Sequence, residues 1–135
     1  MMRIAMMRAA SATILGLGLA VPMSGLANDF SLGLDVDRVP TAQLSLPACN
    51  AAIARGAAAL GYATRVNRDQ KTLITHVSGP PQDGRALIAY CIAAGTYTAW
   101  VVQAFNYSGP NLTEPQRIAT RVSGEIRKAV KPAAK

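Results

Sequence analysis

The stretch from Arg85 to Tyr107 constrains the fold of this chain more than any other segment. It holds two apolar runs, Arg85–Ala93 and Tyr97–Tyr107, with a break at Gly95 between them. Both runs contain the β-branched and aromatic residues that are enriched in strands. We therefore expect two long neighbouring strands joined by a tight turn.

Two shorter strands are expected before this pair. The first is predicted over residues 62–66 and the second over residues 72–77, with the polar stretch 67–71 as the loop between them. Pro80 and Pro81 then separate this hairpin from the long strands, because consecutive prolines remove donors that a strand ladder needs. The sequence thus predicts four strands in one antiparallel meander.

A capped helix is expected on each side of the strands. Ser45 is a favoured N-cap residue and Gly61 suits a left-handed C-terminal cap, so the first helix should lie between them. Thr113–Gln116 has the form of a capping box and should start the second helix. Each helix has one apolar face to bury. The predicted fold is α+β: a two-layer sandwich of helix, four-stranded antiparallel meander and helix, with both helices on one face of the sheet.

The N-terminal segment has the features of a secretory signal peptide. Arg3 and Arg8 precede an uncharged apolar run of about 15 residues, whereas a spanning helix needs roughly 20. Gly25 and Ala27 are small residues that place a cleavage site after Ala27. We expect a cleaved signal peptide over residues 1–27, an extended lead-in over 28–44, a single α+β domain over 45–131 and a basic tail over 132–135. The protein is therefore predicted to be exported, periplasmic or secreted, with no transmembrane segment in the mature chain.

The chain has two cysteines, Cys49 and Cys91, which are 42 residues apart. In an oxidising compartment an isolated even pair favours a disulfide over a metal or redox site. Cys49 shares the apolar face of the first helix, and Cys91 lies in the third predicted strand. The disulfide should therefore join the helix layer to the sheet.

Residues that carry catalytic or ligand chemistry are sparse. His76 is the only histidine, which excludes a multi-histidine metal site, and we expect it on the surface of its strand. The sequence contains no phosphate-binding glycine loop and no nucleophile motif, so we predict no catalytic residue, no metal site and no cofactor. Few aromatic residues are interleaved with the basic ones, and export removes the usual partners, so nucleic-acid binding is not expected.

The sheet face away from the helices is the first candidate binding surface. If the helices cover one face, apolar residues on the other face of the long strands still need cover. A protein partner or a second copy of the chain would supply it, and the lead-in segment is the alternative cover. The candidate partner surface is Tyr90, Trp100, Phe105 and Tyr107. The leading hypothesis is a small exported non-catalytic domain that binds a protein, as an inhibitor or accessory subunit.

The basic C-terminal helix is the alternative surface. After Asn111 the chain has six cationic residues against Glu114 and Glu125, so most of its positive excess lies there. A basic helix attracts anionic lipid or glycan at an envelope surface, although such charges also serve simply to keep a helix face solvated. The candidate anion contacts are Arg117, Arg121, Arg127 and Lys128. A second alternative is an uncharacterised hydrolase, which would have to use His76 as its acid or base.

Overall fold

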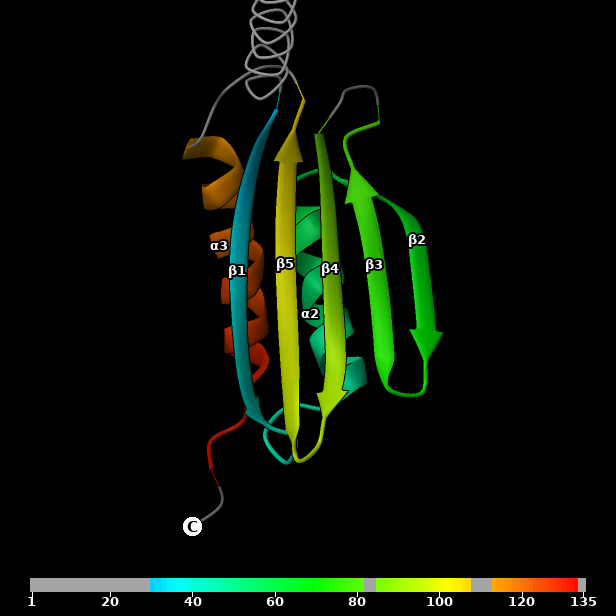
Figure 1. Cartoon of the computed structure of the whole chain (residues 1–135), viewed down its shortest axis with the longest axis vertical. Coiled ribbons are helices and arrows are strands. Elements are labelled where there is room, and N and C mark those ends of the chain that lie inside the picture. Colours follow the sequence, from blue (N-terminus) through cyan, green and yellow to red (C-terminus); the bar gives the residue numbers. More distant parts are fainter. Residues whose placement is uncertain (1–29, 82–84, 108–112, 134–135) are drawn as a thin grey trace, which may run out of the picture.

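A computed structural model of the chain describes residues 30–81, 85–107 and 113–133. The predicted signal peptide lies outside the described residues. Within these described residues, seven elements follow one another: β1 (Ser31–Pro40), α2 (Leu46–Ala59), β2 (Ala63–Gln70), β3 (Leu73–Gly79), β4 (Arg85–Ala94), β5 (Tyr97–Asn106) and α3 (Thr113–Ala129). The strands form one antiparallel sheet in the order β1-β5-β4-β3-β2, and both helices lie behind it in Figure 1. The α+β class is therefore confirmed.

The sheet has five strands rather than the four that we predicted. The additional strand, β1, comes from the segment that was expected as a lead-in, and it pairs with β5 from Ser31 opposite Asn106 to Pro40 opposite Tyr97. Its sequence gives a weak strand signal because Asp35 and Asp37 occupy the positions beside Val36, and aspartate is depleted in strands. Tertiary contacts with α3 compensate for this weakness.

The β2–β3 hairpin also differs from the prediction. β2 runs to Gln70, so most of the polar stretch expected as a loop is strand, and only Lys71 and Thr72 form the turn. β2 is an edge strand whose residues are all exposed. An exposed edge strand does not need an apolar side, and its sequence therefore looks like a loop.

The first helix begins and ends as predicted. The Ser45 side chain accepts a hydrogen bond from the amide of Ala48 at 3.2 Å. At the other end, Gly61 follows the helix with a φ of 77°, a left-handed conformation that glycine adopts without a steric penalty. The helix buries Cys49 and Ile53 against β3 and β4.

The second helix begins at Thr113, as expected, and packs against β1, β5 and α2. The side chain of Gln116 bonds to β1: its amide oxygen accepts from the Leu34 N–H and its amide nitrogen donates to the Leu34 carbonyl, both at 3.1 Å. Gly33 makes this approach feasible, because a Cβ there would overlap the backbone of Pro115 and Gln116.

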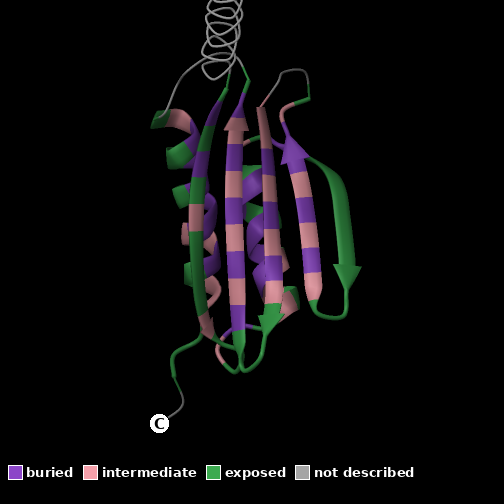
Figure 2. Ribbon diagram, in the orientation of Figure 1, coloured by how far each residue is buried: buried purple, intermediate pink, exposed green. Residues whose placement is uncertain are grey.

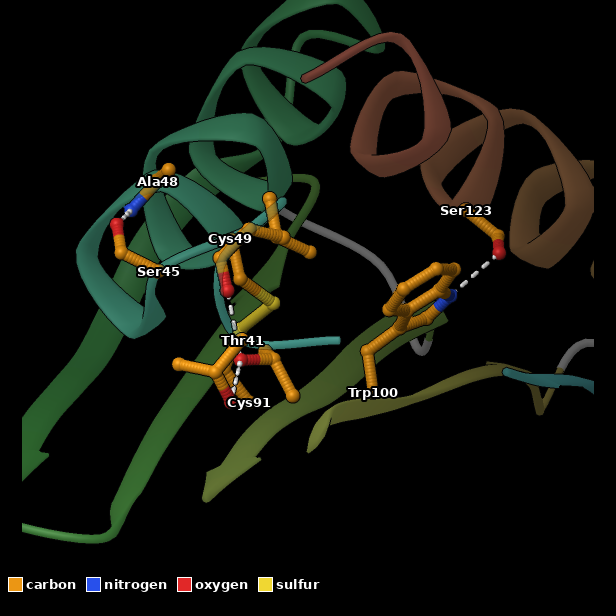
Figure 3. Close-up of a disulfide and its surroundings, with 9 residues drawn as sticks. Thr41, Ser45, Ala48, Cys49, Cys91, Trp100 and Ser123 are labelled. Atoms are coloured by element: carbon orange, nitrogen blue, oxygen red, sulfur yellow. Dashed lines mark hydrogen bonds between the residues drawn. A yellow bond between two sulfur atoms is a disulfide. The ribbon is translucent and has the colours of Figure 1, made fainter. Parts of the chain in front are cut away.

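The core lies between the helices and the sheet. Its largest fully buried side chains include those of Trp100, Ile53, Leu87 and Ile126. Cys49 and Cys91 form the predicted disulfide, which joins α2 to β4 with a Cα–Cα distance of 6.2 Å (Figure 3). The sandwich is therefore held across its two layers by both packing and a covalent bond.

Candidate functional site

The sheet face opposite the helices has no covering layer among the described residues (Figures 1 and 2). We call it the open face. Strand pairing places Val36, Val101 and Tyr90 side by side across three strands of this face. β1 lies beside β5 at the sheet edge, so the expected lead-in does not fold over the open face. Instead it makes that face wider.

Apolar side chains dominate the open face. On β1, Leu32, Leu34 and Val36 are 45%, 47% and 55% exposed, and they add an apolar row that the sequence prediction missed. Side chains that face the same way on the two neighbouring strands, such as Val101 and Ile88, are half-buried by their neighbours. Recognising β1 as a strand from its alternation of apolar residues would have identified this row.

Two of the four predicted partner residues lie on the open face, and a third lies at its end. Tyr90 and Phe105 occupy open-face positions of β4 and β5. Tyr107 follows β5, is 56% exposed, and forms an aromatic cluster with Phe105 and Phe30, whose ring centroids lie 6.2 and 5.8 Å away from its own. The aromatic cluster extends the apolar surface beyond the end of β5.

Trp100 was wrongly assigned to this surface. Its position on β5 is opposite Cys91 and Asp37, both of which face the helices, and its side chain is fully buried. The indole N–H donates to the Ser123 hydroxyl of α3 at 2.8 Å (Figure 3). Residues at odd and even positions of a strand point to opposite faces, so Trp100 and Phe105 cannot share a surface.

Charged residues at open-face positions are all cationic and lie on the two edge strands. Arg38 of β1 stacks over the ring of Tyr97 at 4.7 Å, and Arg68 of β2 lies opposite Thr75. None of the described strand residues that point to this face is an aspartate or glutamate. The open face therefore has an uncharged centre and positively charged edges.

The basic helix does not present all four of its predicted anion contacts. Arg127 bonds to Asp35 at 3.0 Å and to Asp37 at 3.2 Å, and these contacts raise its pKa. The pKa of Asp37 is lowered, chiefly by the hydrogen bond from the Arg38 backbone N–H and also by Arg127. These ion pairs hold α3 against β1. They also compensate the charge of the two aspartates that made β1 difficult to recognise as a strand from its sequence.

Lys128 is also paired within α3, with Glu125 at 2.9 Å. Arg117 and Arg121 are exposed and line a pocket of about 190 Å³ together with Arg85. Arg85 lies 3.7 Å from Glu114 of the same pocket. Arg117 and Arg121 therefore remain the better placed of the predicted anion contacts.

His76 is not on the surface, contrary to our expectation. It points toward the helices from β3, it is 1% exposed, and its Nε2 forms no hydrogen bond with the described residues. Burial lowers the pKa of the imidazole and so favours its neutral form. An acid or base must reach the proton that it transfers, and a side chain this deeply buried does not.

Two other kinds of feature are absent from the described residues. No group of three or more His, Cys, Asp or Glu side chains there is arranged to hold a metal ion. Within residues 30–81, 85–107 and 113–133, no helix is long and apolar enough to cross a bilayer.

Comparison with curated proteins finds no match for this chain. The model of a family of unknown function, DUF6180, matches residues 29–135, which is most of the sequence. The chain therefore belongs to the DUF6180 family of unknown function.

Proposed function

We propose that the protein is a small exported, non-catalytic domain that binds a protein through the open face, as an inhibitor or accessory subunit. The observation that carries the proposal is the uncovered apolar surface across β1, β5 and β4, with Leu34 and Val36 about half exposed. Monomeric soluble proteins rarely expose a contiguous apolar patch of more than a few hundred Å². A surface of this kind favours a protein partner.

The shape of the surface supports a macromolecular partner over a small ligand. Small-molecule sites are concave and enclose most of the ligand. The open face is one side of a sheet, and the pockets near Arg117 and near Thr41 lie on other parts of the molecule. A partner with its own apolar surface would complement the uncharged centre of the open face.

Three observations support export. The disulfide between Cys49 and Cys91 is of a kind that persists in oxidising compartments such as the periplasm or the extracellular space. The N-terminal segment ahead of residue 28 has the charge and hydrophobicity of a signal peptide. The family match begins at residue 29, close to the proposed cleavage site after Ala27.

The proposal is tested by affinity capture from an envelope extract, with the oxidised mature chain as bait. Val36→Glu puts a charge on the open face at a side chain that is 55% exposed, so the fold should tolerate it. Ala54→Glu is the matched control, because it adds the same group at an exposed position of α2 on the opposite layer. We expect the wild type and Ala54→Glu to retain the same protein, and Val36→Glu to lose it. Equal capture by all three would refute the open face as the binding surface.

A second candidate function is an envelope-surface module that binds anionic lipid or glycan. The pocket that Arg117 and Arg121 share with Arg85 favours it, because clustered guanidinium groups bind phosphate and carboxylate groups well. The cationic surface of α3 that is available to an anion is smaller than predicted, since Arg127 and Lys128 are paired with carboxylates of the same molecule.

Co-sedimentation with anionic vesicles tests this second candidate. Binding should weaken as salt rises and should fall in an Arg117→Gln/Arg121→Gln variant. Arg68→Gln removes one positive charge from the other side of the molecule and serves as the control. Binding that is insensitive to both salt and the double substitution would rule out the basic helix as the contact.

A further inference from the structure

We propose that the open face is covered by a second copy of this chain, with two sheets stacked face to face around a twofold axis. The inference rests on the proposed function because it takes the open face as a protein-binding surface. It names a second copy of the chain as the protein bound there, in place of the target of an inhibitor or a larger complex. It follows from the area of the face, the protection of both sheet edges, and the distribution of apolar and charged side chains.

The area of the open face matches what a stable dimer needs. The sheet has five strands, of which β1, β4 and β5 are ten residues long and β2 and β3 are eight and seven. With about 3.4 Å per residue and about 4.8 Å between strands, the face covers roughly 700 Å². Two such faces bury roughly 1,400 Å², which lies within the range of about 1,200–2,000 Å² for specific interfaces.

The sheet cannot readily grow through the β1 edge. The backbone N–H and carbonyl of Leu34, which an added strand would use, are both bonded to the side chain of Gln116. The first turn of α3 also lies directly against Gly33. A second chain would have to displace the Gln116 side chain from Leu34 before it could pair with β1 at this point.

The β2 edge is protected by different means. It contains Arg65, Arg68 and Asp69, and its pairing register with β3 shifts between Thr64 and Val66. Charged side chains and bulges on edge strands disfavour pairing with another sheet. Because both edges are protected, pairing of two sheets edge to edge is disfavoured, and the open face is the apolar surface through which two sheets can associate.

The centre of the open face suits self-association. The middle strand of the sheet is β4, and Tyr90 lies halfway along it, between Val101 of β5 and Thr75 of β3. A twofold axis through this region would bring the two Tyr90 rings close together, and central tyrosines are common binding hot spots. Packed sheets lie about 10 Å apart with their side chains interdigitated, so the apolar rows on either side of Tyr90 would fill the space between the copies.

The charges are compatible with this arrangement. Arg38 lies on one edge strand and Arg68 on the other, so both fall at the rim of the stacked sheets. Rim charges remain in water, where repulsion between like charges is screened by salt. No open-face carboxylate of the described strands would be buried without a partner.

The test is the mass of the purified, oxidised mature chain in solution, measured by sedimentation equilibrium. We expect twice the monomer mass at about 100 μM, well above the micromolar dissociation constant of the weakest interfaces of this size. Val36→Glu and Tyr90→Ala should each raise the dimer dissociation constant at least tenfold, while Ala54→Glu should not change it. Circular dichroism identifies any variant that has lost its fold, and Val36→Glu acts at an exposed edge where folding does not depend on the side chain.

The outcomes separate this inference from the proposed function. A wild-type chain that remains monomeric at this concentration overturns the dimer, and so does a dimer that neither open-face substitution weakens. If the chain is monomeric and Val36→Glu still abolishes capture of another protein, the open face binds a different partner. If the chain is monomeric and Val36→Glu captures the same proteins as the wild type, both the dimer and the proposed function are wrong.

Discussion

The hydrogen bond between Trp100 and Ser123 is a direct test of how α3 is held against the sheet. The indole N–H donates to the serine hydroxyl at 2.8 Å, and both residues are 0% exposed. In Ser123→Ala the N–H remains buried but loses its acceptor. The substitution removes few atoms, so its effect should come mainly from the unpaired donor.

The expected loss of stability follows from two opposing terms. A buried donor left without a partner costs about 1–3 kcal/mol. Alanine is a better helix former than serine by about 0.5 kcal/mol, which offsets part of this cost in α3. The free energy of unfolding should therefore fall by about 0.5–2.5 kcal/mol, a measurable part of the stability of a domain of this size.

Intrinsic fluorescence gives the assay, because Trp100 is the only tryptophan of the chain. We expect the midpoint of urea unfolding to fall in Ser123→Ala with an unchanged m-value. Thr120→Ala is the matched control on the exposed side of α3. It removes a solvent-accessible hydrogen bond from Gln116 and should change stability by less than about 0.5 kcal/mol.

A double-mutant cycle shows whether the hydrogen bond is the cause. In Trp100→Phe the donor is absent, so adding Ser123→Ala should cost nothing further when unfolding is followed by circular dichroism. The reasoning is refuted if Ser123→Ala leaves stability unchanged in the wild-type background, or if its cost is the same in the Trp100→Phe background.

Four further predictions concern other parts of the molecule. Replacing Cys49 and Cys91 by alanine should lower the free energy of unfolding by about 4 kcal/mol, the chain-entropy value for a 42-residue separation, and an unchanged urea midpoint would contradict this. Gly33→Ala should cost up to about 3 kcal/mol because its Cβ overlaps the backbone of α3, and wild-type stability would show that the helix does not lie there. Gly124→Ala should stabilise the protein by about 0.5–1 kcal/mol, since a Cβ there meets nothing within 4 Å and alanine favours helix. A lower melting temperature of the variant would show that the space around residue 124 is not free. The pKa of His76 is lowered by burial from 6.5, so stability should fall as the pH drops from 6.5 toward the folded-state pKa, by up to about 1.4 kcal/mol per pH unit. In His76→Leu, the part of this pH dependence that comes from the histidine should disappear. If urea titrations from pH 7 to 5 give the same change of unfolding free energy with pH in the wild type and the variant, the histidine is not responsible.

The sequence was sufficient for features that depend on a few neighbouring residues. The cap at Ser45 and the left-handed glycine at Gly61 set the limits of α2, and both were predicted from residue type alone. The disulfide followed from the number of cysteines and the presumed compartment, and the α+β class followed from two amphipathic helices around a β-prone stretch. In each case the determining interactions are local or follow from composition.

The extent of the open face was only partly predictable. Tyr90 and Phe105 were identified, but the apolar row of β1 was not, because its aspartates obscured the strand pattern. Asp35 and Asp37 are tolerated in a strand because Arg127, about 90 residues further along the chain, lies against them. No pattern among neighbouring residues in the sequence indicates this contact between distant segments.

The register between strands was likewise decided by the tertiary structure. Trp100 lies opposite Cys91, and this pairing places it under α3 rather than on the open face. The position of β2 at the sheet edge explains why its polar residues form a strand. Residue types along the chain were enough to predict where both helices start, where α2 ends and that residues 85–107 form two long strands. The partner of each strand and the side that each residue faces depend on pairing between distant segments, whose free energy comes from packing and burial that exist only in the assembled sheet.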